Sequence, residues 1–214
     1  MPQDRLERVD LPSAVQPALG CVVTLHGRGV TGEDLVPLAE ELRLSSLRFV
    51  FPDAPFNFMS FSNGRAWYES PPRTHEGLTE SRRLLFRLLE DLEKEGTDPG
   101  RIVLMGFSQG AVMSLDARIR YPKRLAGVIA LSGYLYATDS IGTEKSPASS
   151  GIPILLAHGT YDEVLPPAGS KQAAKVLQAH GFRTRLLEYP MGHQVIPEEL
   201  EEVRSFLKTV LPGV

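Results

Sequence analysis

Apolar positions along the chain fall into short runs that alternate with amphipathic stretches. Six short runs contain apolar residues at consecutive positions, and they cover residues 21–25, 48–51, 101–105, 127–131, 154–157 and 184–189. A strand with one solvated face alternates apolar and polar residues, whereas consecutive apolar residues are typical of strands covered on both faces. The pattern therefore predicts six strands of a buried, mostly parallel sheet.

Helical periodicity appears between these runs. Leucines recur at spacings of three and four within residues 79–95, with Thr79 as the expected N-cap and Gly96 as the expected stop. Three further helices are expected over residues 111–121, 168–180 and 197–210. Strands that alternate with helices predict a doubly wound α/β fold, with helices on both faces of the sheet.

The length of the chain fits one such domain. At roughly 100–200 residues per domain, the 214 residues correspond to one domain or to two small ones. No linker divides the chain, so we expect residues 1–214 to form a single domain. The least regular segments, residues 52–74 and 138–153, are interpreted as surface loops. Neither segment is long enough to form a separate lid domain.

A serine lies between glycines directly after the third predicted strand. Residues 106–110 read Gly-Phe-Ser-Gln-Gly, which matches the G-x-S-x-G pattern of a nucleophile elbow. The apolar strand before it, and the helix that begins with small residues after it, supply the context that this short pattern needs. A sharp strand-to-helix turn would expose the Ser108 hydroxyl in strained geometry, and Gly106 and Gly110 would let neighbouring backbones approach closely. We therefore interpret Ser108 as a nucleophile.

A serine hydroxyl needs an oriented base in order to act as a nucleophile. His193 lies in the loop after the last predicted strand, at the sheet edge where α/β sites assemble. It also completes the chain order serine, acid, histidine that one class of serine hydrolases uses. We predict that His193 is the base, and we interpret His26 and His158 as turn residues that bond to the backbone.

The acid that orients the base is expected after a strand, between Ser108 and His193. Asp162 meets this expectation, because it follows the fifth predicted strand. Glu163 is adjacent, but neighbouring side chains point in different directions, so only one of the two can face the base. Asp139 lies in the other loop and is the weaker candidate. Asp162 is therefore predicted to hold the tautomer of His193 and to stabilise its protonated form.

When a serine attacks an acyl carbonyl, negative charge develops on the carbonyl oxygen. Two backbone N–H groups that converge on this oxyanion are needed to stabilise it. One is expected from Gln109, the residue after the nucleophile, and the other from the loop after the first predicted strand. That loop reads His26-Gly27-Arg28-Gly29, and its glycines permit the turn that would aim the N–H of Arg28. Arg28 and Gln109 are therefore the predicted oxyanion donors.

The composition limits the classes of partner that the protein can bind and indicates the cellular compartment in which it works. With 23 basic and 26 acidic residues the net charge is −3, so the chain lacks the basic excess of a nucleic-acid binder. The single cysteine, Cys21, excludes an internal disulfide and is interpreted as a core thiol. No apolar stretch reaches the roughly 18 residues of a spanning helix, and the N-terminus lacks the apolar core of a signal peptide. We expect a cytoplasmic protein without integral membrane association.

Several motifs, in order, resemble the phospholipase/carboxylesterase family of the α/β-hydrolase superfamily, which includes acyl-protein thioesterases and small bacterial carboxylesterases. The likeness covers nearly the whole chain. The segments that carry it are Leu25-His26-Gly27-Arg28-Gly29, Pro52-Asp53-Ala54-Pro55, Ala66-Trp67-Tyr68-Glu69, the elbow from Gly106 to Ala111, Leu131-Ser132-Gly133-Tyr134, His158-Gly159-Thr160-Tyr161-Asp162 and Gly192-His193.

The resemblance implies an α/β-hydrolase fold, a catalytic triad of Ser108, Asp162 and His193, and oxyanion donors at Arg28 and Gln109. It implies hydrolysis of carboxylic esters or thioesters through an acyl-enzyme on Ser108, with no metal or organic cofactor. Because no insertion is large enough for a lid, we expect an open site and small or flexible acyl substrates. Lysophospholipase or acyl-protein thioesterase activity is the alternative. Less favoured interpretations of the function are a peptidase, an acyltransferase and a non-catalytic binding protein. For the oligomeric state, a homodimer is left open.

An aromatic-rich segment follows the second predicted strand. Its rings could line an acyl pocket or could pack the loop onto the sheet, and the sequence is consistent with both interpretations. The candidate pocket residues are Phe56, Phe58, Phe61, Trp67 and Arg28. Arg28 departs from the family, which usually has an apolar residue there, so its side chain would favour a polar or anionic substrate group. Glu69 is a second departure, because it replaces the usual Asp of its motif.

Overall fold

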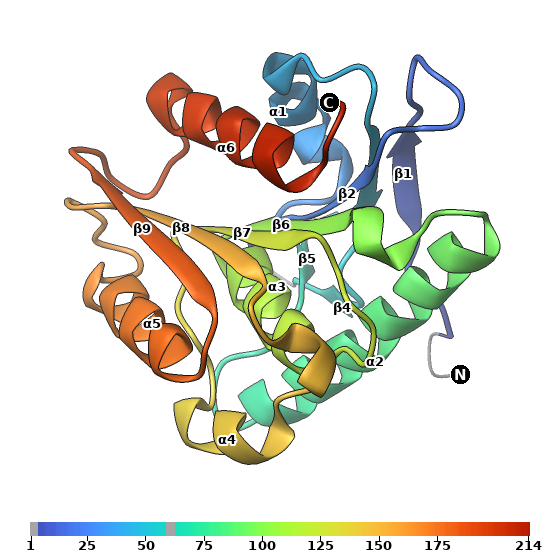
Figure 1. The fold of residues 1–214 in the computed structure, drawn as a ribbon. Helices are drawn as coiled ribbons and strands as arrows, with labels where there is room; N and C mark the ends of the chain where they lie inside the picture. Colours follow the sequence, from blue (N-terminus) through green and yellow to red (C-terminus); the bar gives the residue numbers. More distant parts are fainter. Residues whose placement is uncertain (1–3, 59–62) are drawn as a thin grey trace.

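The computed structural model describes residues 4–58 and 63–214. Its centre is a seven-stranded sheet with the strand order β1-β3-β2-β6-β7-β8-β9 (Figure 1). The strands are β1 (Arg8–Leu11), β2 (Cys21–Leu25), β3 (Arg48–Pro52), β6 (Ile102–Phe107), β7 (Gly127–Leu131), β8 (Pro153–Gly159) and β9 (Arg183–Tyr189). All neighbouring strands run parallel except β1, which pairs antiparallel with β3. The predicted mostly parallel sheet is confirmed.

The sequence pattern missed β1, which lies at one edge of this sheet. Its four residues read Arg-Val-Asp-Leu, and none of them is buried. An edge strand pairs on one side only and is less covered, so it does not need consecutive apolar residues. Strands β2 and β7 are instead buried at every position, as expected for strands covered on both faces.

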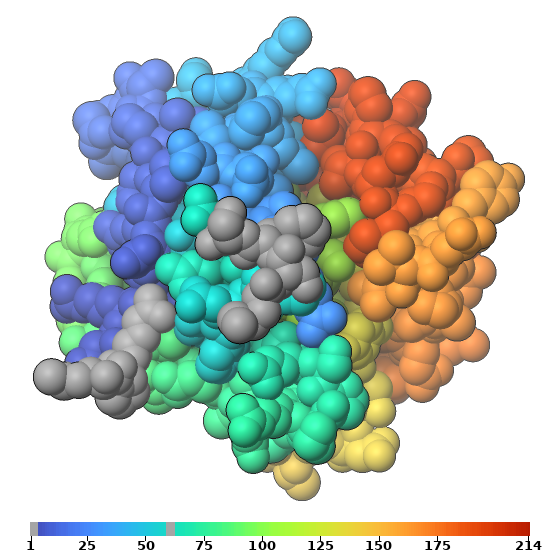
Figure 2. Space-filling model, turned by 180° about the vertical axis from the view of Figure 1, so that it is seen from behind, coloured from blue at the N-terminus to red at the C-terminus, as the bar shows by residue number. Residues whose placement is uncertain are grey.

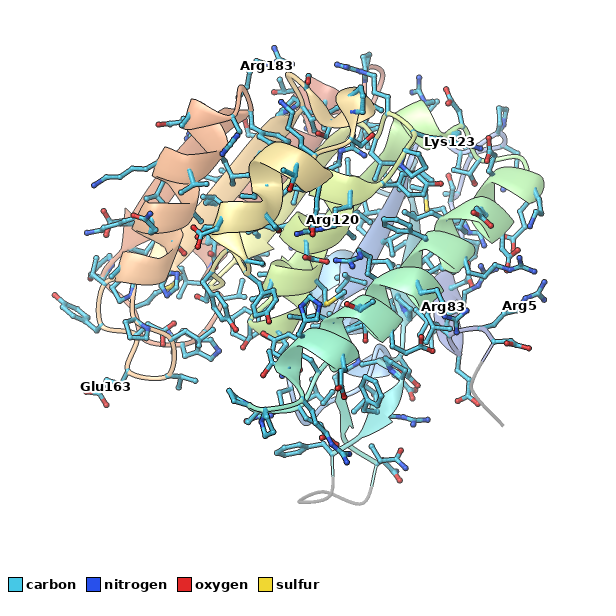
Figure 3. The ribbon with its side chains drawn as sticks, turned by 90° about the horizontal axis from the view of Figure 1, so that it is seen from below. Arg5, Arg83, Arg120, Lys123, Glu163 and Arg183 are labelled. Atoms are coloured by element: carbon cyan, nitrogen blue, oxygen red, sulfur yellow. The ribbon has the colours of Figure 1, made fainter. Side chains whose placement is uncertain are left out.

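Helices cover both faces of the sheet (Figure 1). One face carries α2 (Thr74–Lys94), α3 (Gln109–Arg120), the short α4 (Ile141–Glu144) and α5 (Ala168–Ala179), and the other carries α1 (Val36–Leu42) and α6 (Pro197–Val210). Figure 3 shows α2, α3 and α5 side by side. Apolar side chains of both helical layers pack against the sheet, which confirms the predicted α/β architecture. No helix in the described part of the chain is long and apolar enough to cross a bilayer.

Some predicted boundaries are wrong. Helix α2 begins at Thr74 rather than at Thr79, and the additional turn is held because Gly77 packs closely against Tyr68 and Leu78 enters the core. Segment 52–74 is not a plain loop, since it contains the short hairpin of β4 (Phe56–Asn57) and β5 (Arg65–Ala66). Segment 138–153 likewise contains α4. These elements are too short for hydrophobic periodicity to reveal them.

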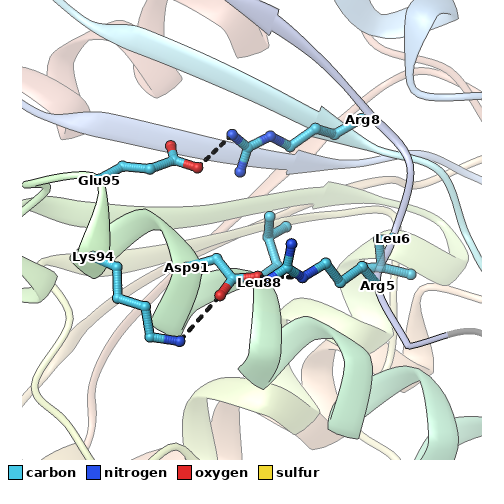
Figure 4. A pocket seen from close by; sticks show the side chains of 7 residues that line it. All are labelled: Arg5, Leu6, Arg8, Leu88, Asp91, Lys94 and Glu95. Carbon is cyan, nitrogen blue, oxygen red and sulfur yellow. Dashed lines mark hydrogen bonds and ion pairs between the residues drawn. The ribbon is translucent and has the colours of Figure 1, made fainter.

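Ion pairs tie the N-terminal segment to the end of α2 (Figure 4). Arg5 lies 3.2 Å from Asp91, and Arg8 lies 2.7 Å from Glu95. These side chains also line a cavity of about 410 Å³, so they stay in contact with water. Solvated pairs of this kind stabilise a protein by only about 0.2–1 kcal/mol each.

A second group of ion pairs lies between α2, α3 and α4 and is centred on a buried carboxylate. The Asp116 carboxylate of α3 accepts hydrogen bonds from Arg82 of α2 at 2.9 Å and from Arg120 at 2.5 Å. Arg120, labelled in Figure 3, also contacts Glu144 of α4. Only 1% of the Asp116 side chain is exposed. One carboxylate therefore joins the helices that cover this face of the sheet.

Replacing Asp116 by Ala is expected to destabilise the protein far more than replacing Asp91 by Ala. Asp116→Ala leaves two guanidinium groups without their buried carboxylate, at a cost of about 3–5 kcal/mol. Asp91→Ala removes contacts with solvated partners and costs less than about 1 kcal/mol. Denaturant unfolding measures both variants, and equal losses of stability would contradict this difference.

Candidate active site

The carboxyl ends of the parallel strands bring the predicted site residues to one edge of the sheet. Leu25 of β2 pairs with Gly106 of β6, and Gly159 of β8 pairs with Tyr189 of β9, so the loops after these four strands start at neighbouring positions. Those loops carry Arg28, Ser108, Asp162 and His193. On the face shown in Figure 2, segments from the N-terminal, middle and C-terminal parts of the chain lie next to one another.

Ser108 forms the turn between β6 and α3. Its φ of 56° and ψ of −119° are strained for a residue with a Cβ. A Cβ on Gly106 would lie 2.2 Å from the carbonyl carbon of Gly110, and a Cβ on Gly110 would lie 2.0 Å from the carbonyl oxygen of Leu25. No real Cβ makes such contacts, so the expectation that both positions require glycine is confirmed.

Three of the predicted site residues form one hydrogen-bonded line. His193 Nδ1 lies 2.7 Å from Asp162 Oδ2, and His193 Nε2 lies 3.0 Å from Ser108 Oγ. A carboxylate only accepts, so Nδ1 carries the proton and Nε2 accepts from the serine hydroxyl. Of the other acids considered, Glu163 points away from the protein (Figure 3), and the exposed Asp139 contacts its neighbour Thr138.

Asp162 is held in place from several sides. Its Oδ1 accepts hydrogen bonds from the N–H of Val164 at 2.9 Å and of Leu165 at 2.8 Å. Burial by itself would raise the pKa of Asp162, but the hydrogen bonds from His193 and from the two N–H groups outweigh it and hold the pKa below its ordinary value. The carboxylate is therefore charged at neutral pH, as the orientation of an imidazole requires.

A contact that the sequence reasoning missed joins His158 to this carboxylate. His158 Nε2 lies 2.8 Å from the Leu165 carbonyl oxygen and 3.2 Å from Asp162 Oδ2. Both atoms only accept, so Nε2 carries a proton, while Nδ1 lies 2.5 Å from Ser170 Oγ. The predicted bond to the backbone is confirmed, and the ring additionally supports the loop of Asp162. The signal available in the sequence was the spacing of four residues between His158, near the end of β8, and Asp162.

His26 orients the loop that carries Arg28. Its Nε2 accepts a hydrogen bond from the N–H of Ala54 at 3.0 Å, so Nδ1 carries the proton and donates to the Gly27 carbonyl at 2.6 Å. In a planar trans peptide this turns the N–H of Arg28 to the opposite side. Among the hydrogen bonds of residues 4–58 and 63–214, neither this N–H nor that of Gln109 has an acceptor. The expected bonding of His26 to the backbone is confirmed.

The side chain of Gln109 joins the elbow to the aromatic segment. Its Oε1 accepts from the N–H of Trp67 at 3.0 Å, and its Nε2 donates to the Tyr68 carbonyl at 3.0 Å. Trp67 Nε1 in turn donates to the His26 carbonyl at 2.9 Å. The prediction of Trp67 as a pocket residue is wrong, because its ring is fully buried in the core beneath the site.

A cavity of about 960 Å³ opens onto Ser108. Arg28 lines it, whereas Phe56 and Phe58 do not, contrary to the prediction for those two rings. Phe56 belongs to the β4–β5 hairpin, and the ring of Phe58 lies 5.2 Å from the Arg28 guanidinium and supports it. Phe61 lies outside the described residues.

The aromatic wall of the cavity comes from other residues, which lie on three separate segments. These are Tyr68 after β5, Phe107 at the end of β6, and Tyr134 and Tyr136 after β7. Leu35 and Val164 add apolar surface from two further loops. The positions are far apart in sequence, so no local pattern could have grouped them.

Cys21 takes no part in this site. It is 1% exposed on β2, and burial raises its pKa to about 12, so it stays a thiol at neutral pH. The interpretation as a core thiol is confirmed. Among the residues described, no group of three His, Cys, Asp or Glu side chains could hold a metal ion.

Comparison with known sequences places the chain in a family. A sequence model described as phospholipase/carboxylesterase matches residues 8–211. The chain belongs to the phospholipase/carboxylesterase family. Among its relatives, acyl-protein thioesterase 1 of Eremothecium gossypii is 30% identical over 95% of this chain and 93% of that protein. Carboxylesterase SOBER1 of Arabidopsis thaliana is 30% identical over 90% of this chain and 91% of that protein.

Solved structures of esterases share the fold. The crystal structure of esterase PE8 has a TM-score of 0.89 and 33% identity, covering 97% of this chain and all of that chain. The crystal structure of SOBER1 from Arabidopsis thaliana has a TM-score of 0.83 and 28% identity, covering 90% of this chain and 99% of that chain. The predicted family, fold and enzyme class, a carboxylic ester hydrolase, are confirmed.

Gly110→Ala is expected to lower kcat/KM for an ester by at least roughly 100-fold, because the clash with Leu25 displaces the elbow and an ångström-scale shift of a reacting group costs that much. Gly142→Ala is the matched control, since its Cβ would meet nothing closer than 3.7 Å. Ester hydrolysis and denaturant unfolding are measured for both variants. Full activity of Gly110→Ala would refute the close contact.

The stability of the protein is expected to depend on His26 below neutral pH. Burial lowers the pKa of His26 below its ordinary value of 6.5, so below that pH the unfolded chain binds a proton that the folded chain does not. The free energy of unfolding therefore falls as the pH falls from 6.5 toward the lowered pKa. Buried Glu199, whose pKa burial raises to about 8, acts in the opposite direction, so a comparison of variants is needed.

The variant His26→Asn removes this titration and is compared with the wild type by denaturant unfolding at pH 7.5 and 5.5. Glu199 contributes equally to both proteins, so the difference between them reports on His26 alone. The wild type is expected to lose more stability than the variant when the pH falls from 7.5 to 5.5. Identical changes would show that His26 titrates alike in the folded and unfolded chains.

Proposed function

We propose that this protein hydrolyses carboxylic esters or thioesters of small or flexible acyl groups, with Ser108 as nucleophile, His193 as base and Asp162 as the acid that orients the base. The observation that carries the proposal is the continuous line of hydrogen bonds from Asp162 through His193 to the Ser108 hydroxyl, at 2.7 and 3.0 Å. The strained turn at Ser108 supports it, because such strain recurs at functional sites.

The reaction runs in two halves. His193 Nε2 takes the hydroxyl proton while Ser108 Oγ attacks the acyl carbonyl, and the charged Asp162 stabilises the imidazolium that forms. The imidazolium then gives this proton to the leaving alcohol or thiol, and the acyl group stays on Ser108. In the second half, water attacks the acyl-enzyme with His193 again as the base. The carboxylic acid leaves, and Ser108 regains its proton.

Backbone N–H groups of Arg28 and Gln109 stabilise the oxyanion in this proposal. The absence of another acceptor for either group among the described hydrogen bonds supports the assignment, because a paired N–H would be less available to a ligand. Gln109 is also the first residue of α3, so the partial positive charge of the helix N-terminus adds to the effect. His26 keeps the Arg28 peptide in the required orientation through its bond to Gly27.

Two observations support the choice of substrate: the cavity at Ser108 and the names of the relatives. The cavity is open and has a volume of about 960 Å³, which suits small or flexible acyl groups. A thioester substrate is the second candidate, because several relatives are named acyl-protein thioesterase 1. Lysophospholipase activity, a cytoplasmic location and a homodimer remain predictions from the sequence.

Ser108→Ala is expected to lower kcat for a p-nitrophenyl ester by at least roughly 10⁴-fold, because the nucleophile is lost while binding is kept. The wild type should show a burst of p-nitrophenol in proportion to the enzyme and should be labelled once by a fluorophosphonate. Ser114→Ala is the matched control, since Ser114 lies buried on α3 and its hydroxyl has no partner among the described residues.

The outcome that would overturn the proposal is a Ser108→Ala protein that keeps full activity and fluorophosphonate labelling. A p-nitroanilide of the same acyl group separates an esterase from a peptidase, because the two reactions share the arrangement of Ser108, His193 and Asp162. Rapid turnover of the anilide would replace the ester and thioester assignment with peptide hydrolysis.

A further inference from the structure

The side chain of Arg28 lies in the wall of the cavity that opens onto Ser108. Its Nη2 donates to Ser70 Oγ at 3.1 Å, and its guanidinium carbon lies 5.2 Å from the centre of the Phe58 ring. These contacts hold the cation over an aromatic face and direct it toward the segment after β5. The side chain is exposed, so its other N–H groups face the cavity or solvent.

No carboxylate of the described residues pairs with this guanidinium, although two acids line the same cavity. Asp34 accepts hydrogen bonds from the N–H and the hydroxyl of Thr31 at 2.7 and 2.9 Å, within its own turn. Glu69 pairs with Arg73 at 3.9 Å. Each acid is thus engaged with a residue of its own segment. Arg28 is the one lysine or arginine among the described residues that line the cavity, and its guanidinium forms no ion pair with them.

A pair of tyrosine hydroxyls stands in the same wall. Tyr68 Oη lies 3.3 Å from Tyr134 Oη, so one hydroxyl donates to the other and the second keeps a free proton. Burial raises the pKa of Tyr68, and the nearby charge of Arg28 acts against that rise without cancelling it. The hydroxyl therefore stays protonated. Tyr68 and Tyr134 both line the cavity and can present this free proton to a ligand.

These groups together contain more donors than acceptors. Ser70 Oγ accepts from Arg28 and keeps its own proton, the tyrosine pair keeps one proton, and the guanidinium keeps its remaining N–H groups. A ligand that satisfies them must supply acceptors and negative charge. A carboxylate does both and matches the planar fork of a guanidinium. Asp34 and Glu69 repel a dianionic phosphate more strongly than a monoanionic carboxylate.

We propose that Arg28, with Ser70 and the Tyr68–Tyr134 pair, binds a free carboxylate carried by the substrate, so that the protein prefers esters or thioesters of molecules with a second, unesterified carboxyl group. The inference rests on the proposed hydrolysis at Ser108 and adds the class of substrate. Because the backbone N–H of Arg28 is the proposed oxyanion donor, the carboxylate lies only a few bonds from the scissile carbonyl. It belongs either to the acyl group or to the leaving group.

The test is a ratio of kcat/KM values for an anionic and a neutral substrate. For the acyl side, mono-p-nitrophenyl adipate is compared with p-nitrophenyl hexanoate, which has the same chain length. For the leaving-group side, 4-carboxyphenyl butyrate is compared with p-nitrophenyl butyrate. Both members of a pair use the same oxyanion donors, so any disturbance of the Arg28 backbone cancels in the ratio.

Arg28→Met is expected to lower the anionic-to-neutral ratio by roughly 10- to 100-fold in one of the two pairs, which corresponds to the loss of a charge-assisted hydrogen bond. Arg28→Lys keeps the charge without the planar fork and should lose less. Arg87→Met removes the same charge from an exposed site on α2 and should leave both ratios unchanged.

The pair that responds identifies the side of the scissile bond on which the carboxylate lies. Ratios that Arg28→Met leaves unchanged in both pairs would overturn the carboxylate subsite while leaving the ester hydrolase proposal intact. An equal fall in the Arg87→Met control would also overturn it, because net charge would then explain the preference. Failure of the Ser108 proposal appears separately, as activity retained by Ser108→Ala.

Discussion

The close approach of three backbone segments at the elbow is the constraint on which the site depends. Gly106 of β6, Gly110 of α3 and Leu25 of β2 leave no room for a Cβ at either glycine. Main-chain packing, rather than a side-chain rotamer, therefore sets the strained conformation of Ser108. The same contact joins the end of β2 to the start of α3, and these two places supply the proposed oxyanion donors. A shift at the elbow would displace the proposed nucleophile and both donors together.

Buried hydrogen bonds extend this fixed region outward. His26 holds the Gly27 carbonyl and the Ala54 N–H, Trp67 bonds to the His26 carbonyl, and Gln109 bonds to the backbone of Trp67. Buried polar groups that are all paired favour one arrangement, because any alternative leaves a group without its partner. The loop that carries Arg28, the elbow and the base of the cavity thus behave as one unit. The Arg28 side chain lies outside this network, so it is available to contact substrate.

Local patterns predicted the strands and the order of the proposed active residues well. Strands β2 and β7 are buried on both faces, so nearly every position had to be apolar, and the elbow needed glycine at fixed spacing. Elements with weaker local constraints were missed, such as the half-exposed β1 at the sheet edge. Trp67 is an aromatic residue in a loop, and by sequence such a residue fits a pocket wall and a core equally well. Its contacts with His26 and Gln109 place it in the core.

The sequence by itself determined the sheet, the elbow and the family, because each follows from residue types at fixed local spacing. The tertiary structure decided how the far-separated loops meet. His158 reaches Asp162 through a turn, and Tyr68 reaches Tyr134 across two segments that are distant in the chain. Contacts of this kind depend on how loops pack on a finished sheet, and packing involves many residues at once. A linear pattern records which side chains are present, and only the folded chain brings their atoms within bonding distance.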